Sequence, residues 1–157
     1  PVLSVIGDIN LTAHPCLSIV GARNASLNGQ KFAEKLARDL GEQKHVIISG
    51  LAKGVDAAAH RGALSTPAKT IAVVAGGIDV IYPEENKDLY KDIAEEGLII
   101  AEAPLGQKPF RESFPRRNRI VSGPQELSEV YMERFYLDYS FVQDLDLRNW
   151  LSATYFW

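Results

Sequence analysis

The sequence predicts an α/β protein with a parallel β-sheet flanked by helices. Up to about residue 101, short apolar runs alternate with segments of helical periodicity, which is typical of stacked βα units. The apolar runs are almost uninterrupted, as expected for strands that are buried on both faces of a parallel sheet. We therefore expect strands at Leu3–Ile6, Leu17–Val20, Val46–Ile48, Thr70–Val74 and Leu98–Ile100.

Helices are expected between these strands. Apolar residues recur at helical spacing from Phe32 to Leu40, with charged residues on the other faces, and Gly41 fits the C-terminus of that helix. A second helix, roughly Val55 to Leu64, is rich in alanine. A third lies near Glu84 to Glu96, and Gly97 is expected to end it.

Length and composition are those of one globular domain. The chain has 157 residues, of which 46% are hydrophobic and 24% charged, far from the composition of disordered or collagen-like chains. The only cysteine, Cys16, lies in an apolar run, so an intrachain disulfide and a four-cysteine zinc site are excluded and a buried thiol is expected. No apolar stretch reaches the length of a membrane span and no signal peptide is evident, so we expect a cytoplasmic protein without a membrane partner.

Charge is distributed unevenly along the chain. A net charge of -3 by itself argues against nucleic-acid binding, but residues 1–123 carry 15 basic and 14 acidic side chains, whereas residues 124–157 carry 2 and 6. Nine of the fourteen aromatic residues also fall in 124–157. We therefore divide the chain into a domain at 1–123 and an acidic, aromatic tail at 124–157. The tail is expected either to pack on the sheet edge or to mediate association.

Glycine-rich segments follow the predicted strands. Because the carboxyl ends of parallel strands meet at one edge, these loops should lie together, and glycine lets a ligand approach the backbone closely. The loops predict a phosphate-binding edge, although each glycine taken alone is equally explained by a tight βα turn. The loops are Gly21–Ser26, Ser49–Gly54, Ala75–Gly77 and Glu102–Gly106.

Arg23 and Lys53 are the cations expected at this edge, and the alternative interpretations are an arginine that only pairs with the sheet edge and a solvated surface lysine. The planar guanidinium of Arg23 suits a phosphate, with Asn24 beside it, and Ser26 or Asn28 is positioned to cap the following helix. The first loop lacks the G-x-G-x-x-G spacing of dinucleotide enzymes, so no nicotinamide or flavin cofactor is expected.

Asp56 and His60 stand four residues apart on one helical face. That spacing suits a metal pair or an acid–base couple, but no third ligand is nearby, so we favour a structural contact that holds helix to loop. The sequence has no G-x-S-x-G motif, and its one cysteine is expected to be buried. We therefore predict no catalytic residue and no metal site.

A basic patch lies between residues 107 and 123. Five basic residues there face only Glu112, and Phe110 and Phe114 lie among them. Single-stranded nucleic acid requires this combination, because its backbone attracts cations and its unpaired bases stack on flat side chains. A solvated charge run is the alternative interpretation. The basic residues are Lys108, Arg111, Arg116, Arg117 and Arg119.

Four ordered segments, Leu17–Ser26, Ile48–Leu64, Thr70–Pro83 and Phe114–Val121, resemble motifs of the DNA-processing protein A family, also called Smf. The resemblance runs from about Pro1 to Gly123. It implies a Rossmann-like domain that binds single-stranded DNA, protects that DNA during natural transformation and assists loading of the recombinase RecA. The family is regarded as a binding mediator and not as an enzyme.

The resemblance also implies which residues contact DNA. The family's glycine-serine-arginine loop falls on Gly21, Ala22 and Arg23, where Ala22 replaces the usual serine and removes one hydroxyl donor. Residues 124–157 do not match, so the family's last strands are expected to be missing, and a homodimer or RecA contact made by the later part of the domain stays open. The expected DNA- and phosphate-binding residues are Gly21, Ala22, Arg23, Asn24, Ser49, Gly50, Lys53, Gly54, Gly76, Gly77, Phe114, Arg116, Arg117, Asn118 and Arg119.

Two other functions remain open from the sequence. Related Rossmann-like phosphoribohydrolases act on nucleoside monophosphates, but they carry a proline-glycine-glycine-x-glycine-threonine loop and a catalytic glutamate, where this chain has only Ala75–Gly77. The other alternative is an inactive, truncated member of the family.

Overall fold

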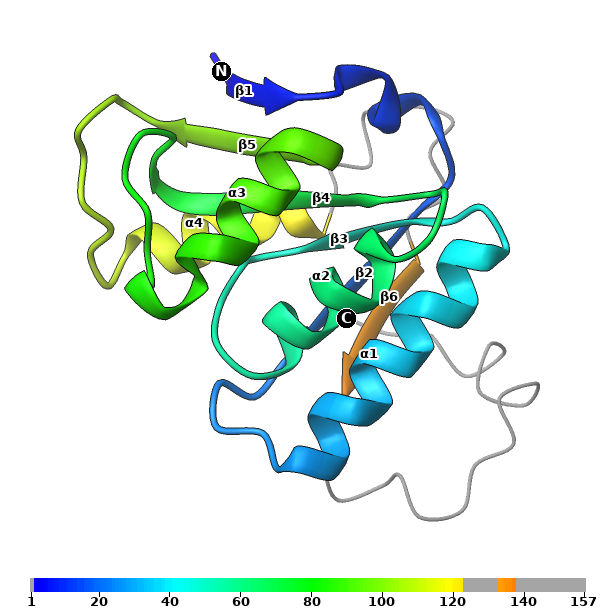
Figure 1. Cartoon of the computed structure of the whole chain (residues 1–157). Helices are drawn as coiled ribbons and strands as arrows, with labels where there is room; N and C mark the ends of the chain where they lie inside the picture. Colours follow the sequence, from blue (N-terminus) through cyan, green and yellow to red (C-terminus); the bar gives the residue numbers. More distant parts are fainter. Residues whose placement is uncertain (1, 123–132, 138–157) are drawn as a thin grey trace.

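The computed structural model describes residues 2–122 and the backbone of residues 133–137. Within this part of the chain, six strands form one sheet: β1 (Ser4–Gly7), β2 (Cys16–Gly21), β3 (Val46–Ser49), β4 (Thr70–Gly77), β5 (Leu98–Ala103) and β6 (Glu133–Leu137). The strand order is β1-β5-β4-β3-β2-β6 (Figure 1). All neighbours are parallel except β1 and β5, which are antiparallel.

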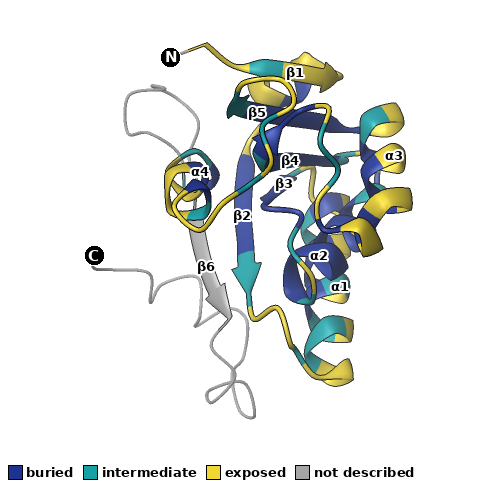
Figure 2. Cartoon of the chain, turned by 90° about the vertical axis from the view of Figure 1, so that its left-hand side faces the viewer, coloured by how far each residue is buried: buried dark blue, intermediate teal, exposed yellow. Residues whose placement is uncertain are grey.

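Helices cover both faces of this sheet. Among the described residues these are α1 (Leu27–Glu42), α2 (Val55–Leu64), α3 (Lys87–Glu96) and α4 (Ser113–Val121), with short 3₁₀ turns η1 (Ile9–Ala13) and η2 (Glu84–Asn86). Figure 2 shows α1, α2 and α3 on one face of the sheet and α4 on the other. The central strands β3 and β4 are consequently buried along almost their whole length. The α/β class and the five predicted strands are confirmed, with ends shifted by a few residues.

The direction of β1 differs from the prediction of an all-parallel sheet. β1 runs antiparallel to β5, with Ser4 opposite Ala101 and Gly7 opposite Leu98. The chain passes from β1 to β2 through η1, without the crossover helix that joins parallel neighbours. Apolar composition therefore identified this strand but not its direction.

Two helical features also differ from the prediction. Part of the basic patch, for which no helix was predicted, forms α4, and its Pro115 lies in the first turn, where a missing N–H is tolerated. Gly41 does not end α1, which continues to Glu42, and the left-handed residue beyond it is Lys44 (φ 67°). Gly41 is required for packing, because a Cβ at this position would lie 2.2 Å from Thr66 Oγ1.

The burial of Cys16 and the cap at the start of α1 are as the sequence predicts. Cys16 is buried, its Sγ–H donates to the His14 carbonyl at 3.1 Å, and burial raises the pKa of the thiol to about 11. Ser26 is the N-cap of α1 and accepts from Gly29 N–H at 3.3 Å.

One strand lies in the segment predicted as the tail. β6 lies parallel to β2, with Glu133 opposite Leu17, while the tail's aromatic side chains lie outside the described residues.

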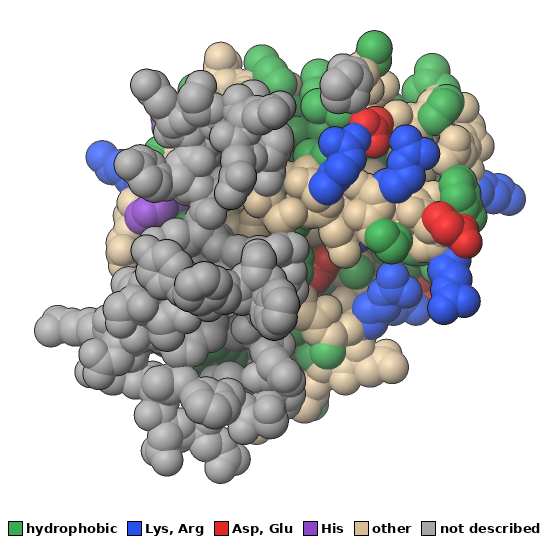
Figure 3. All heavy atoms as spheres, turned by 180° about the vertical axis from the view of Figure 1, so that it is seen from behind, with side chains coloured by type: hydrophobic (Ala, Val, Ile, Leu, Met, Phe, Trp, Pro, Cys, Tyr) green, Lys and Arg blue, Asp and Glu red, His purple; other side chains and the backbone are tan. Residues whose placement is uncertain are grey.

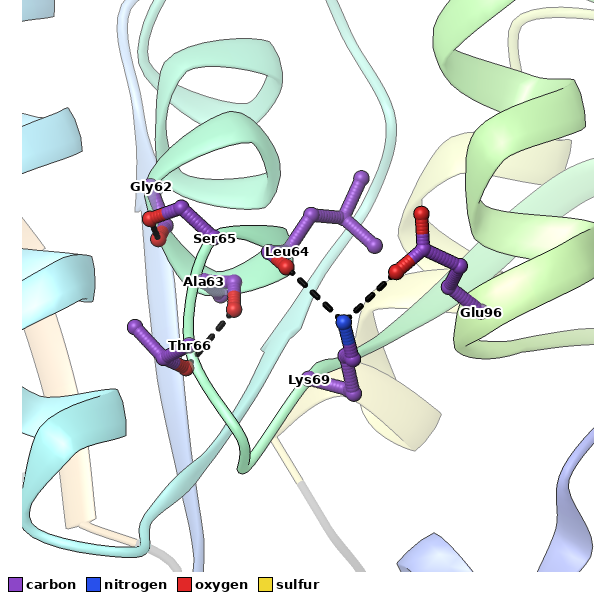
Figure 4. A network of polar contacts seen from close by, with 7 residues as sticks. All are labelled: Gly62, Ala63, Leu64, Ser65, Thr66, Lys69 and Glu96. Atoms are coloured by element: carbon purple, nitrogen blue, oxygen red, sulfur yellow. Dashed lines mark hydrogen bonds and ion pairs between the residues drawn. The ribbon is translucent and has the colours of Figure 1, made fainter.

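Side chains of the connection from α2 to β4 donate hydrogen bonds to the last carbonyls of α2 (Figure 4). Ser65 and Thr66 donate from their hydroxyls to helix carbonyls three residues earlier, each at 2.7 Å. Lys69 donates to the Leu64 carbonyl at 3.1 Å and to the Glu96 carboxylate at 2.6 Å. The last carbonyls of α2 thereby have partners, and the helix is tied to α3.

His60 fastens α2 to the sheet from inside the core. Its Nδ1 lies 2.8 Å from Thr70 Oγ1, and that hydroxyl donates to the Ile47 carbonyl at 2.6 Å. The structural role is as expected, but the partner of His60 is a strand residue and not Asp56. Burial, with smaller contributions from the Arg117 and Arg61 charges, lowers the pKa of His60 from 6.5 to about 3.

His60 is expected to make the fold less stable in acid. Below pH 6.5 the unfolded chain protonates this ring while the folded chain does not, so the free energy of unfolding falls by up to about 1.4 kcal/mol per pH unit as the pH drops toward 3. Urea unfolding between about pH 7 and about pH 4 should show a shallower decrease for His60→Gln. The exposed His14→Gln is the control, and identical slopes for all three proteins would contradict this expectation.

Candidate nucleic-acid interface

The predicted loops meet at one edge of the sheet, where they and α4 surround a small hollow. Arg23 follows β2, Lys53 lies between β3 and α2, Tyr82 follows β4, and Phe114 comes from α4. Together with Pro109, these side chains line a hollow of about 60 Å³. The edge expected from the loops is therefore present, with a cationic and aromatic lining.

Arg23 and Phe114 form one wall of this hollow. Arg23 Cζ lies 4.7 Å from the centroid of the Phe114 ring, within cation–π range. The centroid of Tyr82 is 6.1 Å from that of Phe114, with the ring planes at 52°. Arg23 and Phe114 also line a second hollow, of about 160 Å³, bounded by Gly21 and Asn118. Because Arg23 is exposed, a ligand in either hollow can reach its guanidinium.

The buried side chain of Asp56 joins the loop that follows β2 to the loop that follows β3. It lies in the first turn of α2 and is 4% exposed. One carboxylate oxygen accepts from Gly21 N–H at 3.3 Å, and the other accepts from Gly50 N–H at 3.2 Å. Burial raises the pKa of Asp56, while the Arg117 charge and the backbone donors lower it. From the sequence, backbone N–H groups of these loops were expected to bind phosphate. The N–H groups of Gly21 and Gly50 donate to the Asp56 side chain instead.

Arg117, expected on the DNA surface, is only 7% exposed. Its Nη1 donates to the Gly50 carbonyl and, at 2.5 Å, to the Val73 carbonyl. A Cβ on Gly50 would lie 2.2 Å from Nη1, so glycine is needed for this approach. Desolvation lowers the pKa of Arg117, the Asp56 charge raises it, and the Arg23 charge lowers it. Arg117 thus joins α4 to β3 and β4.

Three of the exposed basic residues, Lys53, Arg116 and Arg119, are paired with carboxylates. Lys53 pairs with Glu85, and the Lys53 contact is the main cause that lowers the pKa of that carboxyl. Arg119 and Arg116 both contact Glu102, the latter at 4.0 Å. Figure 3 shows Lys and Arg side chains beside acidic ones on the α4 face. The local charge is therefore smaller than the residue count of segment 107–123 suggested.

Other predicted site residues have partners within the fold. Ser49 is buried and donates from its hydroxyl to the Ile19 carbonyl at 2.6 Å. Gly77 N–H donates to the Gln107 carbonyl at 2.8 Å. Both groups hold the strand ends to their neighbours.

The remaining predicted residues lie at the surface or in a tight turn. Ala22 and Asn24 are exposed, and Gly76 lines the smaller hollow. Gly54 has φ 77°, and a Cβ there would lie 2.3 Å from the Ala22 carbonyl oxygen. Gly54 therefore permits the close contact between the first two loops.

Three contributors were missed by the sequence analysis. Tyr82 adds an aromatic wall, and Glu85 and Glu102 set the local charge. Tyr82 lies in the segment Thr70–Pro83, whose resemblance to a family motif was the signal in the sequence that could have identified this residue. Glu102 meets Arg119 across 17 residues of sequence, and no periodicity reports such a pair.

No cluster of three or more His, Cys, Asp or Glu side chains suited to a metal occurs among the described residues. Across those same residues, no helix is both long and apolar enough to cross a membrane.

Comparison with known proteins gives consistent matches. The family model for DNA recombination-mediator protein A matches residues 1–132, nine residues beyond the limit at Gly123 inferred from the motifs. Protein Smf of Synechocystis sp. is 45% identical over 109 residues, which are 69% of this chain and 27% of that protein. DNA processing protein DprA of Streptococcus pneumoniae is 44% identical over 117 residues, 74% of this chain and 41% of that protein.

Two solved structures are similar to this fold, each with a TM-score of 0.72. The X-ray structure of DprA from Streptococcus pneumoniae is 42% identical and is matched over 76% of this chain and 42% of its own. A structure of DNA processing protein A from Helicobacter pylori, described for its single-stranded DNA binding mode, is 38% identical and is matched over 76% and 54%. The chain thus spans less than half the length of the curated relatives named above.

Asp56→Asn is expected to destabilise the fold by about 1–3 kcal/mol, because an amide offers one acceptor oxygen and leaves Gly21 or Gly50 N–H without a partner. Urea unfolding measures this change. Glu84→Gln, which alters an exposed carboxylate of η2, is the control and should stay near the unchanged protein. If the Asp56→Asn variant were as stable as the unchanged protein, the carboxylate would not be what holds the two loops.

Proposed function

The chain belongs to the DNA recombination-mediator protein A family, and we propose that it binds single-stranded DNA at the edge that carries Arg23, Lys53 and Phe114. The observation that carries this proposal is the pairing of an exposed guanidinium with an aromatic ring at the mouth of a hollow. A phosphate binds to the guanidinium, and a base contacts the aromatic lining.

The lining favours single strands over duplex. The rings of Phe114 and Tyr82 form a narrow, tilted recess between strand ends and α4. A base enters such a recess only when it is unpaired and unstacked. Phosphate contacts carry no sequence information, so binding tolerates any sequence.

The wider role that we propose is that of a mediator without catalysis. In that role the chain protects single-stranded DNA, assists loading of the RecA recombinase and associates with a second copy of itself. Family membership supports this role. The environment of Asp56 also supports a binding function, because its carboxylate already accepts hydrogen bonds from backbone N–H groups of the loops.

Arg23→Ala is expected to weaken binding of a single-stranded oligothymidylate and to reduce the slope of log K against log salt by about 0.7, because one phosphate contact is lost. Phe114→Ala should cost about 1–3 kcal/mol of binding with less change in slope, because it removes stacking. Fluorescence anisotropy across a salt series measures both effects, with duplex DNA as the weaker ligand.

Arg111→Ala is the matched control for Arg23→Ala. Arg111 is an exposed arginine of the basic patch at residues 107–123, but it lines neither of the two hollows that contain Arg23. If both alanine variants weakened binding equally, nonspecific charge would explain the affinity and the proposed site would be wrong.

Glu85→Gln is expected to tighten DNA binding by about two- to fivefold at low salt, because Lys53 no longer has a competing carboxylate. Combining it with Lys53→Met should remove the gain. Glu84→Gln changes a neighbouring carboxylate that pairs with Lys87, and it should have a smaller effect in the same titration. Equal gains from Glu84→Gln and Glu85→Gln would show that Lys53 has no specific role.

A further inference from the structure

A third hollow, of about 70 Å³, lies beside the one that contains Arg23. It is lined by Glu102, Gln107, Phe110 and Arg116, and it shares Val74 and Ala75 with the smaller Arg23 hollow. The two hollows therefore adjoin at the carboxyl end of β4, separated by the segment 107–114. None of these four side chains except Arg116 belongs to the DNA site expected from the sequence.

The segment that separates the hollows is fixed in place. Gly106 N–H donates to the Asp79 carboxylate at 2.7 Å and 2.9 Å, and the Gln107 carbonyl accepts from Gly77 N–H at 2.8 Å. Phe110 N–H donates to the buried hydroxyl of Ser113 at 3.2 Å. The backbone thus presents Phe110 without needing a ligand to order it.

Phe110 is 49% exposed, although phenylalanine is among the residue types most often buried. The ring faces a hollow whose other lining is mostly polar. An exposed aromatic beside cations is suited to stacking on an unpaired base.

The charges at the rim are suited to a phosphate. Arg116 and Arg119 stand three residues apart on α4 and share the single carboxylate of Glu102, so one positive charge is in excess. The Arg116 side chain is 72% exposed and lies 4.0 Å from the carboxylate, the looser of the two contacts. A phosphate can therefore bind to Arg116 while Arg119 stays with Glu102.

We propose that this hollow is an outer nucleotide site, in which the base contacts Phe110 and the phosphate contacts Arg116. The nucleotide it takes is the neighbour of the one held at Arg23, because the hollows adjoin. This inference rests on the proposed function, since the ligand is the same single strand of DNA. It extends the binding surface from one nucleotide to a track across the carboxyl end of β4.

The test compares short and long ligands on the whole chain. Phe110→Ala and Arg116→Gln should each lower affinity for an oligothymidylate of about ten nucleotides, roughly fivefold or more for Phe110→Ala, as measured by anisotropy. Binding of thymidine 5′-monophosphate, followed by NMR titration, should change little in both variants, because a single nucleotide is held at Arg23 and does not reach the outer site. Phe110→Trp keeps a flat ring and should keep the affinity for the long ligand.

Arg23→Ala and Arg111→Gln separate the possible outcomes. Arg23→Ala should weaken both ligands, and Arg111→Gln, which alters an exposed arginine outside the hollow, should preserve the length dependence. If Phe110→Ala and Arg116→Gln leave the long ligand unaffected while Arg23→Ala weakens it, the outer nucleotide site is overturned and the proposed function stands. If the unchanged chain binds neither ligand, both are overturned.

Discussion

The architecture of the site depends on two buried charged side chains, Asp56 and Arg117. Asp56 accepts N–H groups from the ends of β2 and β3, and Arg117 donates to carbonyls of β3 and β4 from the opposite face of the sheet. Burying charges is costly unless they are hydrogen-bonded and face an opposite charge. Both conditions are met here, since the Arg117 charge lowers the pKa of Asp56 against the effect of burial. The pair therefore fixes the loops, the strand ends and α4 relative to one another.

Helical spacing then divides the basic segment into two faces. Phe114 and Arg117 stand three residues apart and face the strand ends, whereas Arg116 and Arg119 face Glu102. The guanidinium of Arg117 lies close enough to Arg23 for the Arg23 charge to lower the pKa of Arg117, so both arginines contribute positive potential at this edge. At the proposed DNA site, Arg117 thus contributes positive potential from the interior, and Arg23 is placed to contact the ligand from the surface.

The sequence predicted those parts of the fold that depend on local pattern. Uninterrupted apolar runs identified the strands, and the alanine-rich segment gave α2 within its observed bounds. The direction of β1 and the helix at 113–121 were not predicted, because the first depends on which edge the strand joins and the second combines Pro115 with mostly polar residues. In the site, Arg23 followed from its place after a strand. The carboxylates Glu85 and Glu102 did not, because their partners lie 32 and 17 residues away.

The glycine-rich loops bear on how the proposed DNA site binds an anion. In a phosphate-binding loop, backbone N–H groups at a helix N-terminus point to the ligand. Here the N–H groups of Gly21 and Gly50 are bonded to the Asp56 carboxylate, and that of Gly77 to a carbonyl. Glycine at position 50 serves close packing against a guanidinium. These three N–H groups are therefore not available to a phosphate, and at the DNA site that we propose the exposed arginine and lysine side chains bind the repeating single charges of the strand.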